Sequence, residues 1–437
     1  IKLDPTQTVL VNTTLGVYGQ QQFGWNDRLF LTGAVRVDNN SAFGEDFDFV
    51  VYPKVSASWV LSEEPFWNVG FVDALKLRAA YGQSGQQPDA FAALRTLTSA
   101  ARGNGTSGVT PESFGNADLK PERGTEIELG FETALFDRLS LDFTYFSKRT
   151  RDAILERETA PSGGFPGDQF VNVGEVSNHG IELAAVLQAL TRDNLAIEIG
   201  GNVATNNDEV EDLGDIPFIS IGSQRHVVGY PIGGFWSRRV VSADRDPATH
   251  AVSNILCDGG PGGAPVPCAQ APQVYLGPSI PTLTAAVFTN ITISNRLTLH
   301  GLVDFQDGHM RYNVGEWGRC GAVVPVCEAI YRPENFSTEY LAGISAVALT
   351  NAVDGAFIQE ASFAKLREIS ATYRIPEQWL GRVGLSTASL TVAGRNLATW
   401  TDYRGLDPES RIPGAAGSDQ AVLPQLTQFV ASLSFSF

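Results

Sequence analysis

The last eleven residues, 427–437, carry the pattern that most constrains the fold of this chain. Phe429, Leu433 and Phe435 fall on one face of an extended strand, and the opposite face carries glutamine or serine at every position but Val430. Successive side chains of a strand point to opposite faces, so one face is apolar and the other is small and polar. A soluble sheet would bury the apolar face, whereas an outer-membrane barrel would turn it toward lipid. Because soluble chains more often end in a polar tail, an apolar strand that ends at Phe437 favours the barrel.

Length and charge narrow the alternatives further. With 437 residues the chain has room for two or three ordinary domains or for one large barrel. The formal net charge of -17 argues against a nucleic-acid partner. The longest nearly apolar run, residues 341–349, is far shorter than the ~20 residues that a membrane-spanning helix needs. A membrane protein of this sequence would therefore cross the bilayer with strands.

Thirteen segments show the alternation expected of strands. Many of them run for about 10 to 14 residues, which suits a tilted membrane strand better than the ~5 to 6 residues usual in soluble proteins. We expect strands at 9–23, 28–38, 50–60, 74–83, 126–133, 139–146, 178–189, 194–206, 281–293, 296–305, 363–374, 386–396 and 427–437.

The connections between these segments alternate in length. Short ones at 24–27, 137, 190–193 and 294–295 take turns with long ones, mostly of about 30 to 75 residues. Outer-membrane barrels have short periplasmic turns and long extracellular loops, whereas a soluble sandwich has no reason to sort its loops by length. The sequence therefore predicts an all-β protein, an antiparallel transmembrane β-barrel.

The number of predicted strands indicates whether this chain could form a whole barrel. Bacterial single-chain barrels have an even number of strands, whereas thirteen is odd. The chain also begins at Ile1 and contains no charged segment followed by the apolar core of a signal peptide. We therefore expect residues 1–437 to be the carboxy-terminal portion of a longer barrel.

The four cysteines form two local pairs, Cys257 with Cys268 and Cys320 with Cys327, each in a segment rich in glycine or proline. Zinc sites usually combine tighter spacing with added histidines, so two loop disulfides are the favoured interpretation. Disulfides indicate a location outside the cytoplasm.

Several stretches together resemble one protein family. They lie at 26–38, 53–66, 75–85, 119–126, 172–182 and 229–233, and near the end at 361–369 (Ala-Ser-Phe-Ala-Lys-Leu-Arg-Glu-Ile), 394–397 (Gly-Arg-Asn-Leu) and 402–409 (Asp-Tyr-Arg-Gly-Leu-Asp-Pro-Glu). Each is weak alone, but their order and spacing across nearly the whole chain resemble the SusC/RagA-like branch of TonB-dependent outer-membrane transporters. The resemblance implies a parent barrel of 22 strands with an amino-terminal plug and a TonB box, neither of which lies in this chain.

The same resemblance implies a function and partners. Family members commonly work in the outer membrane with a SusD-like surface lipoprotein to import oligosaccharides or peptides, using energy delivered through the TonB complex. This chain would be the barrel part of such a nutrient importer, reaching the TonB complex only through the missing amino-terminal part. The alternatives are a plug-free passive pore, a structural or adhesive barrel, an enzyme embedded in a barrel, and a soluble carbohydrate-binding sandwich.

The sequence contains no recognisable catalytic or metal-binding motif. Its five histidines are scattered, and no pattern of a zinc protease, serine hydrolase or P-loop occurs. We expect neither enzymatic activity nor a cofactor. Aromatic side chains in the long loops could stack on sugar rings or contact the lipoprotein, although loop packing and an interfacial aromatic girdle explain them as well; the candidates are Tyr230, Trp236, Trp317 and Tyr331. The terminal Phe437 resembles the signal by which barrels are delivered to the outer-membrane assembly machinery.

Overall fold

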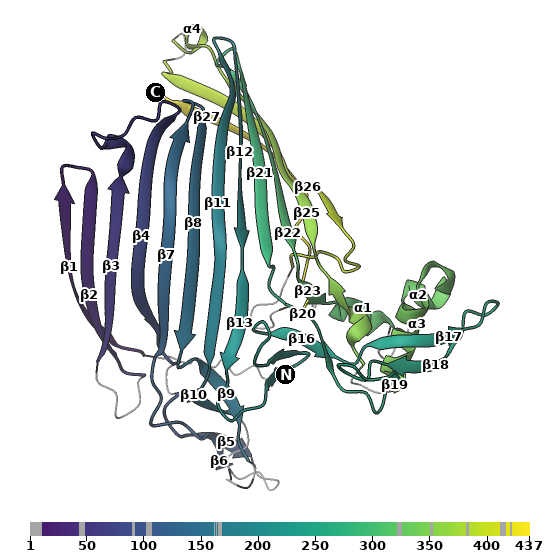
Figure 1. The fold of residues 1–437 in the computed structure, drawn as a ribbon. Coiled ribbons are helices and arrows are strands. Elements are labelled where there is room, and N and C mark those ends of the chain that lie inside the picture. The colour runs from purple at the N-terminus through teal and green to yellow at the C-terminus, as the bar shows by residue number, and fades with distance from the viewer. Residues whose placement is uncertain are drawn as a thin grey trace.

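A computed structural model of the chain describes residues 11–42, 49–89, 92–101, 107–160, 162, 164, 168–320, 326–349, 353–381, 384–410, 417–419 and 422–437. Its main feature is one large antiparallel sheet in which thirteen strands pair in succession (Figure 1). A further strand, β13 (Asn207–Asp212), follows β12 and pairs with β11. In order, the thirteen are β1 (Thr14–Trp25), β2 (Leu29–Asn40), β3 (Val50–Val60), β4 (Val72–Gln86), β7 (Glu122–Leu135), β8 (Leu139–Arg151), β11 (Glu175–Arg192), β12 (Leu195–Thr205), β21 (Leu283–Ile293), β22 (Leu297–Asp307), β25 (Phe363–Arg374), β26 (Thr387–Thr401) and β27 (Gln428–Ser436).

These thirteen strands are the thirteen that the alternating pattern predicts. The bounds at 50–60 and 363–374 agree with the prediction, and the terminal strand is one residue shorter at each end. The first strand begins at Thr14, and the predicted residues 9 and 10 lie outside the described part of the chain. Several strands extend further than predicted, because their ends lack the apolar alternation on which the prediction depends.

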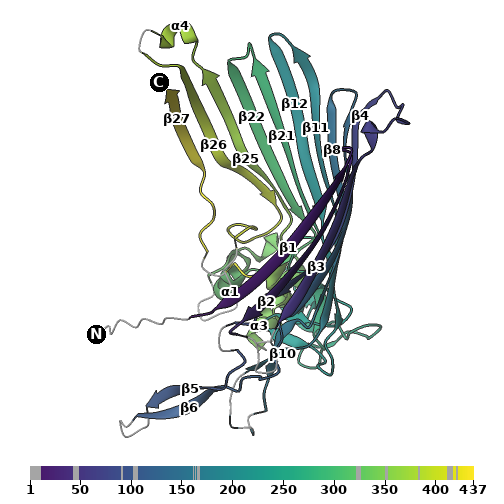
Figure 2. The ribbon, with the colours of Figure 1, turned by 90° about the vertical axis from the view of Figure 1, so that its left-hand side faces the viewer.

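The sheet curves into a trough, and β1 and β27 form its two edges (Figure 2). Within the described part of the chain, β1 pairs only with β2, and β27 pairs only with β26. Among the same residues, no helix is long and apolar enough to cross a membrane.

Tight turns connect several strands at one end of the sheet. The β1–β2 turn has positive φ at Asn26 and Asp27, and the β21–β22 turn has positive φ at Ser294 and Asn295. Asparagine and aspartate tolerate this left-handed conformation, which matches the twist of a hairpin. We call this end of the sheet, at the top of Figure 1, the turn end.

The long connections lie at the opposite end, which we call the loop end, and they contain short elements of their own (Figure 1). Helix α4 (Glu377–Leu380) is not part of a long connection, since it lies between β25 and β26 at the turn end. The elements of the long connections are β5 (Thr96–Ala101), β6 (Ser107–Ser113), β9 (Ile154–Glu158), β10 (Asp168–Asn172), β14 (Ile219–Ile221), β15 (Gln224–His226), β16 (Gly234–Ser237), β17 (Val240–Arg245), β18 (Val252–Cys257), β19 (Val266–Pro267), β20 (Val274–Gly277), α1 (Val314–Cys320), α2 (Glu328–Tyr331), α3 (Thr338–Leu349), β23 (Met310–Tyr312) and β24 (Ile358–Glu360).

The convex face of the sheet is apolar and exposed. A soluble protein would bury such a row of large side chains, whereas a membrane barrel presents it to lipid. Along the strands the exposed apolar residues include Leu31, Val35, Leu77, Ile127, Leu129, Ile181, Ile199, Val287, Ile369, Leu390, Val392, Phe429 and Leu433. This outward face and the segregated loops are those of an antiparallel transmembrane barrel wall.

Candidate functional site

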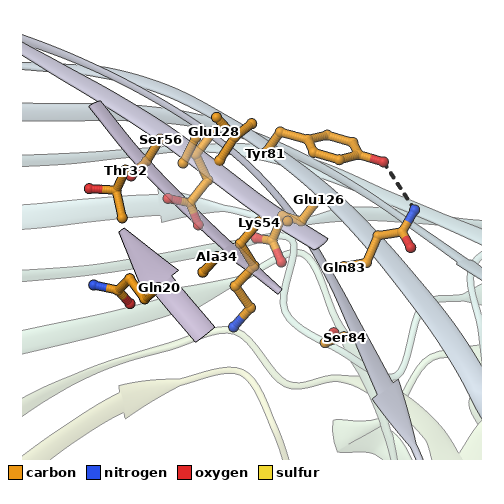
Figure 3. A pocket seen from close by; sticks show the side chains of 13 residues that line it. Gln20, Thr32, Ala34, Lys54, Ser56, Tyr81, Gln83, Ser84, Glu126 and Glu128 are labelled. Atoms are coloured by element: carbon orange, nitrogen blue, oxygen red, sulfur yellow. Dashed lines mark hydrogen bonds between the residues drawn. The ribbon is translucent and has the colours of Figure 1, made fainter. Parts of the chain in front are cut away.

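The concave face of the sheet carries the polar side chains and is the first candidate site. Lys54 of β3 and Glu126 and Glu128 of β7 point into the trough (Figure 3). Two hollows of about 360 and 600 Å³ lie along this wall, and both are lined by the same two glutamates. Most of the remaining lining residues are small or polar, among them Gln20, Thr32, Ser56, Ser84, Thr144 and Asn202. A wall of this kind suits water or a hydrated solute, as in a barrel lumen.

Ion pairs between neighbouring strands balance part of the acidic charge on this wall. Arg78 of β4 lies 3.0 Å from Glu132 of β7 and also pairs with Asp142 of β8. Lys76 lies 3.2 Å from the same Glu132. All four side chains are one third to one half exposed. Carboxylates cannot remain charged in a dry core without partners, so their exposure here agrees with a wet lumen.

Breaking this network is expected to have a small effect on stability. In the full-length protein, Arg78→Met should change the free energy of unfolding by less than about 1 kcal/mol, because exposed ion pairs contribute little. Urea unfolding in detergent micelles measures the change. A loss of 3 kcal/mol or more, which is about what breaking a buried ion pair costs, would contradict a water-filled trough.

Three long connections pack together at the loop end and form a second candidate site, which we call the loop assembly. It consists of the described residues between β12 and β21, between β22 and β25, and between β26 and β27. Helix α3 packs against β17 and β18, which belong to a different connection (Figure 1). The core around α3 contains Leu341, Ile344, Val347 and Phe357. A hydrophobic core shared between connections makes them one folded unit rather than separate loops.

Both disulfides belong to the loop assembly. Cys257 and Cys268 are joined, with their Cα atoms 4.8 Å apart, and Cys257 belongs to the same buried cluster as Ala346 of α3. Cys320 and Cys327 are joined as well, with their Cα atoms 5.0 Å apart, and both lie in the core around α3. Each bridge closes a short segment and limits the conformations open to its connection.

Polar contacts also hold the loop assembly together. Arg245 of β17 donates hydrogen bonds to the carbonyl oxygens of Pro333 at 2.7 Å and Phe336 at 2.9 Å. Inside the core, the hydroxyl of Tyr340 donates to Glu316, and the Gln359 amide donates to the same carboxylate at 2.7 Å. Burial and the neighbouring Glu316 carboxylate raise the pKa of Tyr340, so its hydroxyl keeps the proton that it donates.

The four aromatic residues named from the sequence lie in three different environments. Tyr230 and Trp236 pack against each other and against Tyr275, with ring centroids 4.9 to 5.7 Å apart. Trp317 of α1 packs against the core around α3, whereas Tyr331 of α2 is 70% exposed. Tyr275 was not identified from the sequence, because it joins this cluster from β20, a strand too short to show an alternating pattern. Burial, with the charge of Asp208, raises the pKa of Tyr275 to about 12, so the hydroxyl of Tyr275 stays protonated.

Metal-ligating residues are dispersed. Within the described ranges, no group of three or more histidine, cysteine, aspartate or glutamate side chains lies close enough together to hold a metal ion.

Comparison with known proteins agrees with the architecture. The family model described as "TonB dependent receptor-like, beta-barrel" matches residues 4–397. Two curated proteins of Formosa agariphila are similar along nearly the whole chain. TonB-dependent receptor P26 is 27% identical over 95% of this chain and 45% of its own length. TonB-dependent receptor P3 is 24% identical over 100% of this chain and 47% of its own length.

Solved structures show the same fold. The RagAB peptide importer in its "closed-closed" state superposes with a TM-score of 0.82 at 20% identity, covering 97% of this chain and 48% of that one. Its "open-open" state gives a TM-score of 0.81 at 19% identity, covering 98% of this chain and 47% of that one. The chain thus spans about half the length of the curated relatives and solved structures that it matches.

Proposed function

The chain belongs to the TonB-dependent receptor β-barrel family, whose members are outer-membrane transporters rather than enzymes, and we propose that it is the carboxy-terminal barrel part of an energy-coupled nutrient importer. One observation carries the proposal: the same strands present an apolar face outward and a polar, charge-bearing face to a trough. That arrangement suits passage of a hydrated substrate through a lipid bilayer. The loop end is then extracellular and the turn end periplasmic.

The barrel is proposed to be completed by further strands between β1 and β27. In the described part of the chain both strands have a free edge, and unpaired backbone groups inside hydrocarbon cost several kcal/mol each. A barrel of 22 strands, the size associated with a plugged lumen, would need about nine strands beyond these thirteen. The plug domain and the TonB box would precede this chain in the parent protein and would connect the barrel to the TonB complex.

The loop assembly is the proposed contact surface for a SusD-like surface lipoprotein. It lies at the extracellular end, its hydrophobic core is shared by two connections, and it exposes apolar side chains such as Tyr331, Val326 and Ile330. Exposed apolar groups on a rigid unit are typical of protein contact sites. Trp317, which packs against the core around α3, would stabilise this surface.

The substrate is proposed to be an oligosaccharide or a peptide. Rings that expose part of a face bind both classes, because they stack on sugars and on apolar or cationic side chains. The half-buried cluster of Tyr230, Trp236 and Tyr275 offers such rings within the loop assembly. Tyr230 and Trp236 are therefore the proposed substrate contacts.

Transport by the complete receptor tests the proposal. Cells that express it together with its lipoprotein should accumulate a labelled oligosaccharide or peptide, and an uncoupler that collapses the proton gradient should abolish the accumulation. The rival function, a passive pore, predicts a steady ion conductance of the purified receptor in a planar bilayer without any energy source. Uptake that persists in the presence of the uncoupler, together with such conductance, would contradict the importer.

A further inference from the structure

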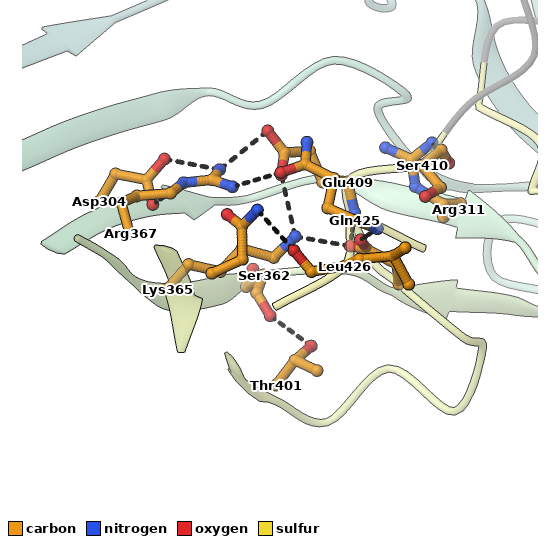
Figure 4. Close-up of polar contacts among 12 residues, drawn as sticks. Asp304, Arg311, Ser362, Lys365, Arg367, Thr401, Glu409, Ser410, Gln425 and Leu426 are labelled. Atoms are coloured by element: carbon orange, nitrogen blue, oxygen red, sulfur yellow. Dashed lines mark hydrogen bonds and ion pairs between the residues drawn. The ribbon is translucent and has the colours of Figure 1, made fainter. Parts of the chain in front are cut away.

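Three of the sequence stretches named above meet at one place in the fold, and Figure 4 shows Lys365, Arg367 and Glu409 at this place. Residues 361–369 contribute Lys365 and Arg367 of β25. Residues 394–397 lie in β26, and residues 402–409 follow β26 in the last extracellular connection. The proposed transport function does not explain why these three stretches come together.

Two buried or half-buried cations of the wall bind two anions of the connection. The Lys365 ammonium lies 2.7 Å from Asp407 and 2.9 Å from Glu409. The Arg367 guanidinium lies 2.8 Å from Glu409 and 2.8 Å from Asp304 of the neighbouring strand β22. The side chains of Lys365 and Asp407 are only 4% and 6% exposed. Charges this deeply buried persist only when they are paired, so the connection is fixed to the wall at this point.

The pKa values of the Asp407 and Glu409 carboxyl groups agree with these ion pairs. Burial alone would raise the pKa of Asp407, but hydrogen bonds from Lys365 and from two backbone N–H groups hold it below its usual value. The pKa of Glu409 is lowered by Lys365 and Arg367 in the same way, against the effect of burial. Both carboxylates therefore stay charged and keep their cations.

A β-bulge in β25 sets the orientation of the Arg367 side chain. Opposite β22, Leu366 pairs with Val303 and Glu368 with Leu302, so Arg367 is an extra residue in β25. Arg367 and Glu368 consequently both face the lumen although they are consecutive in sequence. Glu368 uses this position to pair with Arg395 of β26 at 2.9 Å, leaving Arg367 free to reach the connection.

Residues 425–427, which lead from the connection into β27, are bound at the same place. The amide of Asn396, a residue with φ of 51°, donates to the carbonyl oxygen of Leu426 at 3.2 Å. The Thr427 hydroxyl donates to the carbonyl oxygen of Asn396 at 2.7 Å. Arg367 donates to the Gln425 amide oxygen at 3.2 Å, and the Gln425 N–H donates to Asp407 at 3.2 Å. Both ends of the connection are therefore attached to β25 and β26.

The middle of the connection contacts the helices of the loop assembly. The Arg404 guanidinium lies 4.0 Å from the ring centroid of Tyr340 in α3. The Tyr403 hydroxyl donates to Asp419 at 2.7 Å, and Asp419 accepts the backbone N–H of Val314 at the start of α1 at 2.9 Å. One short segment thus touches the lumenal wall on one side and both helices on the other.

We propose that residues 402–410 and 417–419 of the loop assembly act as a strut, and that Lys365 and Arg367 are positioning residues that fix the rest of the loop assembly over the extracellular mouth through this strut. The barrel wall contributes Lys365 and Arg367, and the strut contributes Asp407 and Glu409. Helices α1 and α3 contact other residues of the strut. The inference does not depend on which substrate is carried, because it concerns only the position of the loop assembly.

A distance measurement in the full-length receptor tests this role. Spin labels are attached to cysteines introduced at Arg332, which is exposed beside α2, and at Val392, which is exposed on the convex face of β26. Pulsed electron resonance then gives the distribution of distances between loop assembly and barrel wall. With Lys365→Met the distribution should widen about twofold or more, because the released segment samples several positions. Lys365→Arg, which keeps the charge, should restore the narrow distribution.

Arg395→Met is the matched control. It breaks the ion pair with Glu368 on the same wall and leaves the strut untouched, so its distribution should remain narrow. Heat-modifiable migration on gels shows in each case that the barrel is folded. A narrow distribution for a folded Lys365→Met receptor would overturn the proposal. Should that variant not fold, Tyr403→Phe with Arg404→Ala separates the strut from the helices without touching the wall, and an unchanged distribution there would overturn the proposal equally.

Discussion

A receptor that lacks residues 427–437 is expected to be absent from the outer membrane in folded form. Strand β27 pairs with β26 through nine residue pairs, and its removal leaves the ladder of β26 unpaired inside hydrocarbon. Each unsatisfied backbone group there costs several kcal/mol, so the total far exceeds the 5–15 kcal/mol that stabilises a typical protein. The deletion also removes Phe437, the predicted assembly signal. Heat-modifiable migration of outer-membrane fractions measures the folded receptor.

A deletion in an extracellular connection provides the control. Strands β5 and β6 form a separate two-stranded sheet that projects from the loop end (Figure 2). Replacing residues 96–113 with a short glycine linker removes more residues but leaves every barrel strand paired, so this variant should assemble normally. Normal heat-modifiable receptor after loss of residues 427–437 would contradict both the closing role of β27 and the signal assigned to Phe437.

The barrel wall was predictable because one physical rule governs most of its length. Lipid outside and water inside require alternation at every second residue, so strands such as β3 and β25 could be placed to the residue. Where strands leave the bilayer the rule no longer applies. The observed β26 continues to Thr401, five residues beyond its predicted end, because Leu397 to Thr401 carry no clear alternation.

The loop assembly was not predictable by the same rule. Helix α3 contains Leu341, Ala342 and Ile344 in a nearly continuous apolar run, since neighbouring connections cover it on more than one side. A helix buried on several sides lacks the polar stripe by which amphipathic helices are recognised. The sequence identified this run only as too short to span a membrane.

Contacts between side chains that are far apart in the sequence were not predictable either. The stretches containing Lys365 and Asp407 stood out by resemblance, but nothing in their spacing says that the two side chains meet 2.7 Å apart. That contact depends on the register of β25 against β26 and on the path of the connection after Thr401. The loop aromatics show the reverse case, because the sequence grouped residues such as Trp236 and Trp317 that the fold places in different clusters.

Lysine substitutions on adjacent residues of β7 are expected to differ by several kcal/mol. Leu129 lies at the centre of the strand on the convex face and is 51% exposed, whereas Glu128 lines the trough. Leu129→Lys places a charge near the middle of the bilayer, where it should cost about 2–4 kcal/mol. Glu128→Lys places the same side chain in the wet lumen and should change the free energy of unfolding by less than about 1 kcal/mol. Urea unfolding of the full-length receptor in lipid vesicles measures both values.

The comparison between the two variants assigns the faces of the sheet independently of transport. Both introduce the same side chain into the same strand, so strand propensity and paired neighbours are closely matched and the surrounding medium is the main difference. In detergent micelles with short chains the penalty for Leu129→Lys should shrink, because the amine reaches water more easily. Equal costs for the two substitutions in vesicles would mean that the convex face does not meet lipid, and the membrane orientation of the whole sheet would then be wrong.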